Sequence, residues 1–111
     1  MIYLSKYGAK ESNSTFGFKI AISPPPNGYT VDILFKEVYP LKDISYTADE
    51  KEYRHKYFKV LNPHLRELVN VSKALNNYGS VYLMSNPKDY HDIIVAEKLR
   101  KEGINVKLLR S

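Results

Sequence analysis

The sequence predicts an α/β fold, a small three-layer sandwich with a mostly parallel sheet and a C-terminal βαβ unit. The last third of the chain carries this prediction. An apolar strand at residues 81–84 is followed there by a polar turn, a helix and a second strand at residues 104–109. Two earlier apolar strands can extend the same sheet. Because 111 residues is a common size for one domain, residues 1–111 are predicted to form a single domain.

The first half of the chain supplies the other strands. Residues 2–5 and 18–23 are rich in residues that favour strands, and the polar segment between them is predicted to be a loop. Three prolines followed by Asn27-Gly28 end the second strand, because proline cannot donate to a ladder. Residues 29–39 alternate in hydrophobicity and predict either a short strand or an extended cover, which Pro40 ends.

Two consecutive helices are predicted in the middle of the chain. Thr47 and Glu50 have the spacing of a capping box, and the first helix runs from there to about residue 61. Asn62-Pro63 is predicted to close this helix and to begin a second one, because proline is favoured at the first helical position. In the βαβ unit, Asn86 is predicted to cap the last helix.

Composition narrows the classes of function. The chain has no cysteine, which excludes disulfides and thiolate chemistry and makes a cytoplasmic location the expectation. No run of about 18 apolar residues occurs, so no membrane partner is predicted. The net charge of +5 fits an anionic partner such as nucleic acid, and equally an ordinary solvated surface.

Polar side chains follow the predicted strands, at the edge where open parallel sheets bind ligands. Hydroxyls beside a free helix N-terminus can hold a phosphate or carboxylate, although serine is common at strand ends in any case. His91 follows on the last helix and is either a candidate acid, base or anion contact or a polar residue at the edge of the core. The candidate ligand site comprises Ser5, Tyr7, Ser23, Arg54, Ser85, Asn86 and His91.

The sequence contains no motif for nucleotide or metal chemistry. Neither G-x-x-x-x-G-K nor G-x-G-x-x-G occurs. His55 and His64 lack the spacing of a metal site, and helix capping explains the clustered carboxylates. We therefore predict neither a metal nor a cofactor.

A second candidate surface lies on the first predicted helix. Lys51, His55 and Lys59 recur every four residues, and Arg54 lies next to them. Such a row, with tyrosines beside it in the sequence, can contact a nucleic-acid backbone. The same pattern is also typical of a solvated helix face.

Several blocks of the chain resemble the proteins grouped as domain of unknown function 488. They are MIYLSKY at the N-terminus, FKIAIS before the prolines, EYRHKY at residues 52–57 and VYLMSNPKDYHDIIVAEKL at residues 81–99. The resemblance implies an α/β sandwich with a mainly parallel sheet. The family's signature is a strand that ends in Cys and a Cys-His-Arg triplet that opens a helix. These positions are similar to Ser85 and to Tyr90-His91-Asp92, so only the histidine is kept, and the resemblance implies little about activity.

Two functions follow as alternatives. The first is a binding module for an anionic partner, either nucleic acid or a phosphate-bearing ligand. The second is an enzyme or a degenerate enzyme with a site at the C-terminal ends of the strands around His91. A pocket that encloses His91 and Arg54 favours the enzyme, whereas a flat basic face favours the binding module. A homo-oligomer built through a tyrosine-rich surface is a third arrangement.

Overall fold

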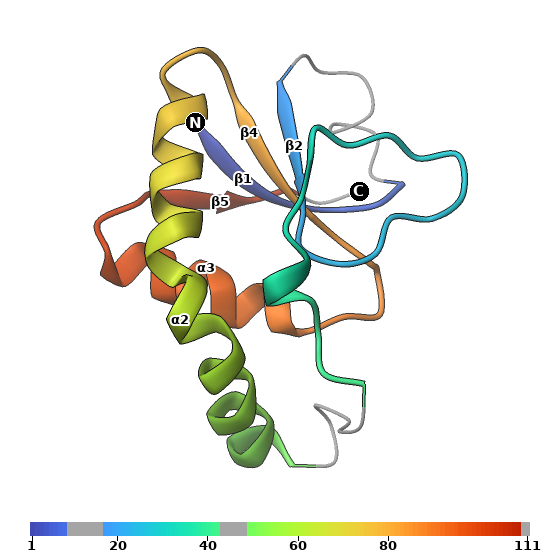
Figure 1. The fold of residues 1–111 in the computed structure, drawn as a ribbon, viewed down its shortest axis with the longest axis vertical. Helices are drawn as coiled ribbons and strands as arrows, with labels where there is room; N and C mark the ends of the chain where they lie inside the picture. The colour runs from blue at the N-terminus through green and yellow to red at the C-terminus, as the bar shows by residue number, and fades with distance from the viewer. Residues whose placement is uncertain (9–16, 43–48, 110–111) are drawn as a thin grey trace.

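The protein is described here by a computed structural model that covers residues 1–8, 17–42 and 49–109. In this part of the chain, five strands form one sheet in which every pair of neighbours is parallel. The order across the sheet is β3-β2-β4-β1-β5 (Figure 1). The strands are β1 (Ile2–Lys6), β2 (Phe18–Ala21), β3 (Ile33–Leu34), β4 (Val81–Ser85) and β5 (Val106–Leu108). Most of the loop predicted after β1 lies outside the described residues.

The predicted α/β fold with a parallel sheet and a C-terminal βαβ unit is confirmed. β4 leads through a turn into α3 (His91–Lys101), which leads into β5. β1 lies between β4 and β5 and pairs with both of them. The βαβ unit therefore crosses over the first strand of the chain. The ambiguous segment before Pro40 contains β3 and a short 3-10 helix, η1 (Lys36–Val38).

The middle of the chain folds into one long helix. α2 (Glu50–Asn76) contains Pro63 in its interior, so the prediction that Asn62-Pro63 separates two helices is wrong. The buried stripe of the helix continues on both sides of Pro63, with Leu61 before it and Leu65 after it. Pro63 itself is exposed. The carbonyl that loses its hydrogen-bond partner to proline is therefore on the side that water reaches, and core packing outweighs the local penalty.

The capping residues also differ from the prediction. Asp49 caps α2, because its carboxylate accepts the Glu52 N–H at 3.1 Å; the predicted cap, Thr47, lies outside the described residues. α3 has no side-chain cap. The side-chain amide of Asn86, the predicted cap of α3, donates instead to the carbonyl of Pro24 at 3.2 Å. A short turn therefore separates Asn86 from the start of α3.

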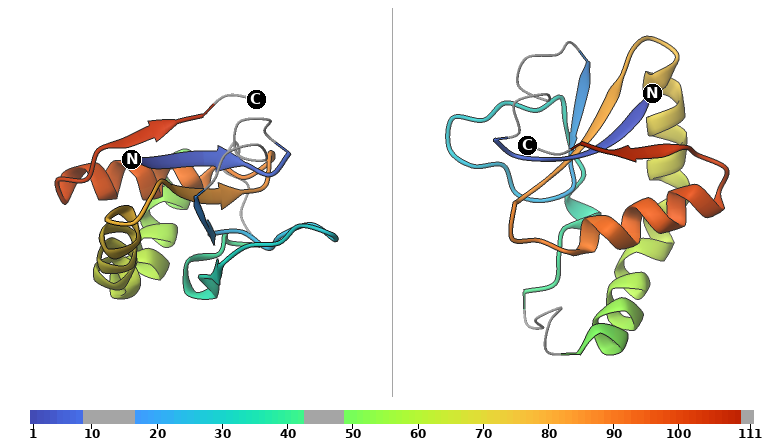
Figure 2. Two further views of the ribbon diagram at one scale, coloured as in Figure 1. Left: turned by 90° about the horizontal axis from the view of Figure 1, so that it is seen from above. Right: turned by 180° about the vertical axis from the view of Figure 1, so that it is seen from behind.

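The layering differs in one respect from the predicted three-layer sandwich. Among the described residues, α2 and α3 both pack on one face of the sheet, where they share a single core cluster (Figure 2, left). Right-handed crossovers account for this, because β3 to β4 and β4 to β5 run in the same direction across the sheet. The connection from β2 to β3 runs in the opposite direction. Its Tyr29 and Val31 help to cover the other face, beside Tyr82 and Met84.

Candidate functional site

The carboxyl end of β4 lies where ligand sites form in open parallel sheets. The chain leaves β4 through α3 toward one edge of the sheet, whereas it leaves the neighbouring strands β1 and β2 toward the other edge. The connections from β2 and β4 therefore diverge, and such a point of reversed winding leaves a crevice outside the strand ends. Ser23, Ser85 and His91 are brought to this end of the sheet.

The His91 ring is directed at the end of β2. Its Nε2 lies 2.7 Å from the Ile22 carbonyl oxygen and 3.4 Å from Ser23 Oγ. Because a carbonyl oxygen only accepts, Nε2 carries the ring proton and Nδ1 is left as an acceptor. The ring is fully buried beside Tyr57. Within the described residues, Nδ1 has no hydrogen-bond partner.

Burial lowers the pKa of His91, and this effect outweighs the hydrogen bond to the Ile22 carbonyl and the nearby carboxylates of Asp89 and Asp92. The lowered pKa favours the neutral form, which is the form that matches the Nε2–H tautomer. A neutral, buried imidazole is a poor contact for an anion. The ring has the predicted direction, but its burial favours the core reading of this residue.

Ser23 lies between Asp89 and His91. Its Oγ donates to the Asp89 carboxylate at 2.7 Å, so its proton already has an acceptor. In a nucleophilic triad the histidine lies between the serine and the carboxylate and takes the proton of the serine. Here Nε2 is itself a donor to a carbonyl. The geometry joins the end of β2 to the turn before α3 and does not activate Ser23.

Lys6 joins the end of β1 to the same turn. Its Nζ lies 2.6 Å from Asp92 Oδ2 and donates to the carbonyls of Asp89 at 2.7 Å and Asn86 at 3.2 Å. Ser85 Oγ donates to the same Asp92 oxygen at 2.9 Å. We call Lys6, Ser85 and Asp92 the ion cluster, in which Ser85 and Asp92 are buried and the Lys6 side chain is 31% exposed. The hydroxyl that the prediction offered to a ligand anion thus binds the carboxylate of the protein itself.

Sequence reasoning missed Lys6 and Asp92 as members of this site. The available signal was their position, because Lys6 ends β1 and Asp92 follows the first residue of α3. In a parallel sheet, the carboxyl ends of the strands lie beside the amino ends of the helices that follow them. A lysine and an aspartate at these two positions therefore predict an ion pair.

Two predicted residues, Ser5 and Tyr7, do not join the ion cluster. Ser5 alternates with Leu4, whose side chain is in the core cluster under the helices, so Ser5 faces the other side of the sheet. Tyr7 packs in the cluster on that other side. Its hydroxyl donates to the Ser23 carbonyl at 2.8 Å, and burial raises the pKa of the phenol.

Arg54 is bound by carboxylates on the helices. Its guanidinium lies 2.6 Å and 3.3 Å from the two carboxylate oxygens of Glu97 on α3, and its Nε lies 3.2 Å from Glu50. The hydrogen bond from Arg54 is the main cause of the lowered pKa of Glu97. These contacts join α2 to α3, so Arg54 is held by groups outside both candidate sites.

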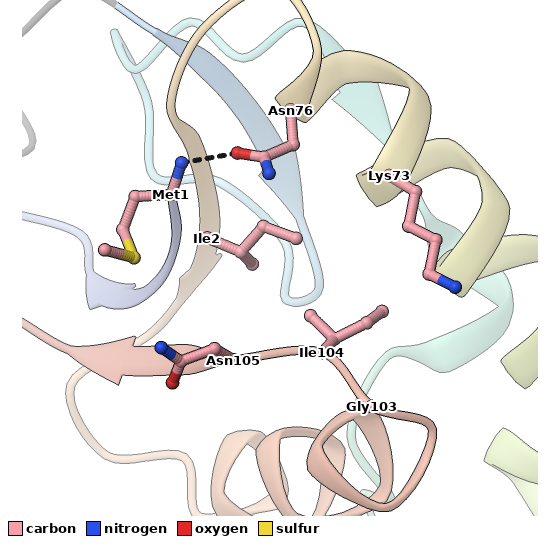
Figure 3. Close-up of a pocket in the computed structure, with 7 residues that line it drawn as sticks. All are labelled: Met1, Ile2, Lys73, Asn76, Gly103, Ile104 and Asn105. Carbon is pink, nitrogen blue, oxygen red and sulfur yellow. Dashed lines mark hydrogen bonds between the residues drawn. The ribbon is translucent and has the colours of Figure 1, made fainter.

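A cavity lies at the opposite end of the strands. It has a volume of about 370 Å³ and is placed by the starts of β1 and β5 and the end of α2 (Figure 3). Neither His91 nor Arg54 lines it. The residues that line it are Met1, Ile2, Lys73, Asn76, Gly103, Ile104 and Asn105. The amino ends of the strands lie here, whereas open parallel sheets bind ligands at the carboxyl ends of their strands.

The predicted basic row extends along most of α2. Because Pro63 does not end the helix, the spacing of Lys51, His55 and Lys59 continues into its second half. We call the whole row the basic stripe, and its members are Lys51, His55, Lys59, Asn62, Arg66, Asn70 and Lys73. All seven side chains are exposed. The steps of three and four residues place them on one side of the helix.

Several carboxylates near the basic stripe lie beside basic groups outside it. Glu52 binds Lys56 at 2.9 Å, and Glu67 lies 4.0 Å from the His64 ring. Glu97 binds Arg54. Within the described ranges, the structure gives the cations of the stripe no ion pair. In this part of the chain the cations of the stripe are therefore unpaired, although negative charge remains beside them, because Glu50 and Glu97 share Arg54 and the His64 ring near Glu67 is charged only when it is protonated.

The described part of the chain contains neither a cluster of metal ligands nor a helix that could span a membrane. Over residues 1–8, 17–42 and 49–109, no three side chains of His, Cys, Asp or Glu gather as metal ligands would. No helix in these ranges is long and apolar enough to cross a bilayer.

Comparison with known proteins assigns no family to the chain. No family model, no curated protein and no solved structure matches it. Membership of domain of unknown function 488 therefore stays a prediction.

Stability is expected to fall on acidification because of His91. The native pKa of His91 is lowered by burial, so below about pH 6.5 the unfolded chain binds a proton that the native ring binds only at lower pH. The slope of the free energy of unfolding against pH then approaches about 1.4 kcal/mol per pH unit.

His91→Gln, which can keep a donor toward Ile22, should reduce this slope in urea titrations between pH 7 and pH 5. His55→Gln, at an exposed ring, is the matched control, and equal slopes in wild type and His91→Gln contradict the assignment.

Proposed function

We propose that the protein is a binding module for an anionic partner, and that this partner is nucleic acid held by the basic stripe of α2. One observation carries the proposal: within the described residues, four cations lie exposed on one side of α2 and form no ion pair, namely Lys51, Lys59, Arg66 and Lys73. A regular line of cations on an exposed helix complements a line of phosphates. Binding of this kind releases counterions and depends little on base sequence.

The place of α2 in the fold supports the proposal. The amino-terminal part of the helix, drawn in green, projects past α3 and away from the sheet (Figure 1). Lys51, His55 and Lys59 belong to this part, and all three are exposed. A long polymer can therefore approach the stripe without displacing the sheet.

The other candidates have less support. A small phosphate-bearing ligand at the strand ends has to compete with the hydrogen bonds of Ser23 and Ser85 to Asp89 and Asp92. An enzyme around His91 needs a reactive group that substrate can reach, and the His91 ring is fully buried. The enzyme alternative stays a prediction, which a turnover screen with phosphoesters can test.

The salt dependence of binding tests the proposed function. The triple variant Lys51→Ala/Lys59→Ala/Arg66→Ala removes three cations of the stripe. Each phosphate contact contributes about 0.9 to the slope of log K against log salt on a duplex, so the variant should flatten that slope by about 2.7. Fluorescence anisotropy with a labelled DNA of random sequence, titrated at several salt concentrations, measures the slope.

A control variant with the same change in net charge distinguishes binding by the stripe from attraction of DNA to the whole positively charged protein. Lys36, Lys88 and Lys107 are exposed and lie off α2, so their triple alanine variant lowers the net charge equally. This control should keep most of the wild-type slope. If both triple variants lose the same amount, or if the wild type does not bind at low salt, the proposal is wrong.

A further inference from the structure

We infer that the nucleic acid held by the basic stripe is double-stranded. This inference rests on the proposed function and specifies its ligand. It comes from what the helix presents: side chains that contact phosphates lie along the stripe, whereas the aromatic rings of α2 itself are covered. Proteins that bind single strands combine a basic groove with exposed aromatic platforms.

The aromatic residues of α2 cannot stack on bases. Tyr53 and Tyr57 are adjacent to the stripe in the sequence, but their exposed fractions are 3% and 0%. Phe58 is partly buried, and the Lys98 ammonium lies 4.3 Å from the centre of its ring. The stripe therefore offers ammonium, guanidinium, imidazole and amide groups, which are the groups that contact phosphates.

The length and shape of the stripe also fit a duplex. A rise of about 1.5 Å per residue places Lys51 and Lys73 about 33 Å apart along α2. A duplex of about ten base pairs has this length, at about 3.4 Å per pair. An exposed helix is also a convex surface, whereas single strands are bound in grooves. A convex stripe can lie against the outside of a duplex and cross its phosphate backbones at intervals, because these wind once around the axis in about ten base pairs.

Tyr78 is the aromatic group near the stripe that is most open to solvent. It lies two residues after the end of α2, and 84% of its surface is exposed. If a single strand stacked a base on this ring, Tyr78→Ala would weaken binding about fivefold or more. For a duplex, whose bases are already stacked on one another, the same variant should leave affinity unchanged.

The test compares a labelled 20-base-pair DNA duplex with each of its component strands. Four permanent cations, Lys51, Lys59, Arg66 and Lys73, predict salt slopes of about −3.6 on the duplex and about −2.8 on a single strand. Extrapolated from 1 M salt, this difference makes duplex binding about tenfold tighter at about 50 mM salt. Anisotropy titrations of the wild type and of Tyr78→Ala give both slopes and affinities.

The outcomes separate the two proposals. Tighter duplex binding that is indifferent to Tyr78→Ala supports a double-stranded ligand. Equal or tighter binding of single strands, or a loss of about fivefold in Tyr78→Ala, overturns this inference and leaves the proposed function standing. Failure of both probes to bind at low salt overturns the proposed function itself. Poly-glutamate of matched charge that binds as tightly as the duplex shows that an acidic protein fits the stripe equally well, and it also overturns the inference.

Discussion

Replacement of Lys6 by methionine is expected to lower the free energy of unfolding by about 3–5 kcal/mol, because it leaves a buried carboxylate without its cation. The Asp92 side chain has only 3% of its surface exposed, and Lys6 Nζ lies 2.6 Å from it. Methionine keeps the length of the side chain and removes its charge. The Asp92 carboxylate then retains the Ser85 hydroxyl and the Ile93 N–H, each at 2.9 Å, and neither of these donors neutralises it.

Chemical denaturation of four proteins tests this prediction as a double-mutant cycle. The wild type, Lys6→Met, Asp92→Asn and the double variant are compared, because Asp92→Asn keeps an acceptor for Ser85 and removes the charge. The double variant should be more stable than Lys6→Met alone, which identifies the buried charge as the cause. Lys107→Met, at an exposed position on β5, is the matched control. A loss within about 0.5 kcal/mol for Lys6→Met contradicts the prediction.

Leu99→Ala is expected to cost about 2–5 kcal/mol, because it opens a cavity between α3 and the sheet. Leu99 is fully buried in the core cluster that α2, α3 and the strands share. It lies near the end of α3, and its carbonyl accepts the Ile104 N–H at 3.0 Å, so the residue also sets the turn into β5. Leu99→Ala keeps this backbone hydrogen bond, so the loss of stability reports the packing of the side chain between α3 and the sheet.

Thermal and urea unfolding measure this loss. Ile93→Ala is the matched control on the same helix, because 39% of Ile93 is exposed and its truncation leaves the core intact. The control should change stability much less than Leu99→Ala. Similar losses in the two variants mean that the buried face of α3 is assigned incorrectly.

Local patterns predicted the strands and the βαβ unit well, since apolar runs between turn residues report burial directly. They failed where distant packing decides the outcome. Pro63 favours a helix boundary locally, but Leu61 and Leu65 hold both sides of it against the sheet. The position of β1 between β4 and β5 also leaves no local mark, because the pairing of parallel strands is a long-range property.

In the candidate sites, too, local patterns predicted some features and distant packing decided the others. The side chains of Ser23, Ser85 and His91 do reach one end of the sheet, because strand ends and helix starts meet there. Their partners could not be predicted, because hydrogen bonds to Asp89 and Asp92 depend on the path of the turn before α3. The basic stripe was recognised only in its first half, because the helix was divided at Pro63.

The place of β1 between β4 and β5 has a consequence for the synthesis of the protein. Ile2 pairs with Val81 on one side and Val106 on the other, so β1 leaves the ribosome well before either of its neighbours. Until those neighbours emerge, its unsatisfied backbone groups are free to pair with other chains. Long-range pairing of this kind slows folding. A nascent chain that stops before Val81 therefore exposes a strand that chaperones and aggregating chains can both bind.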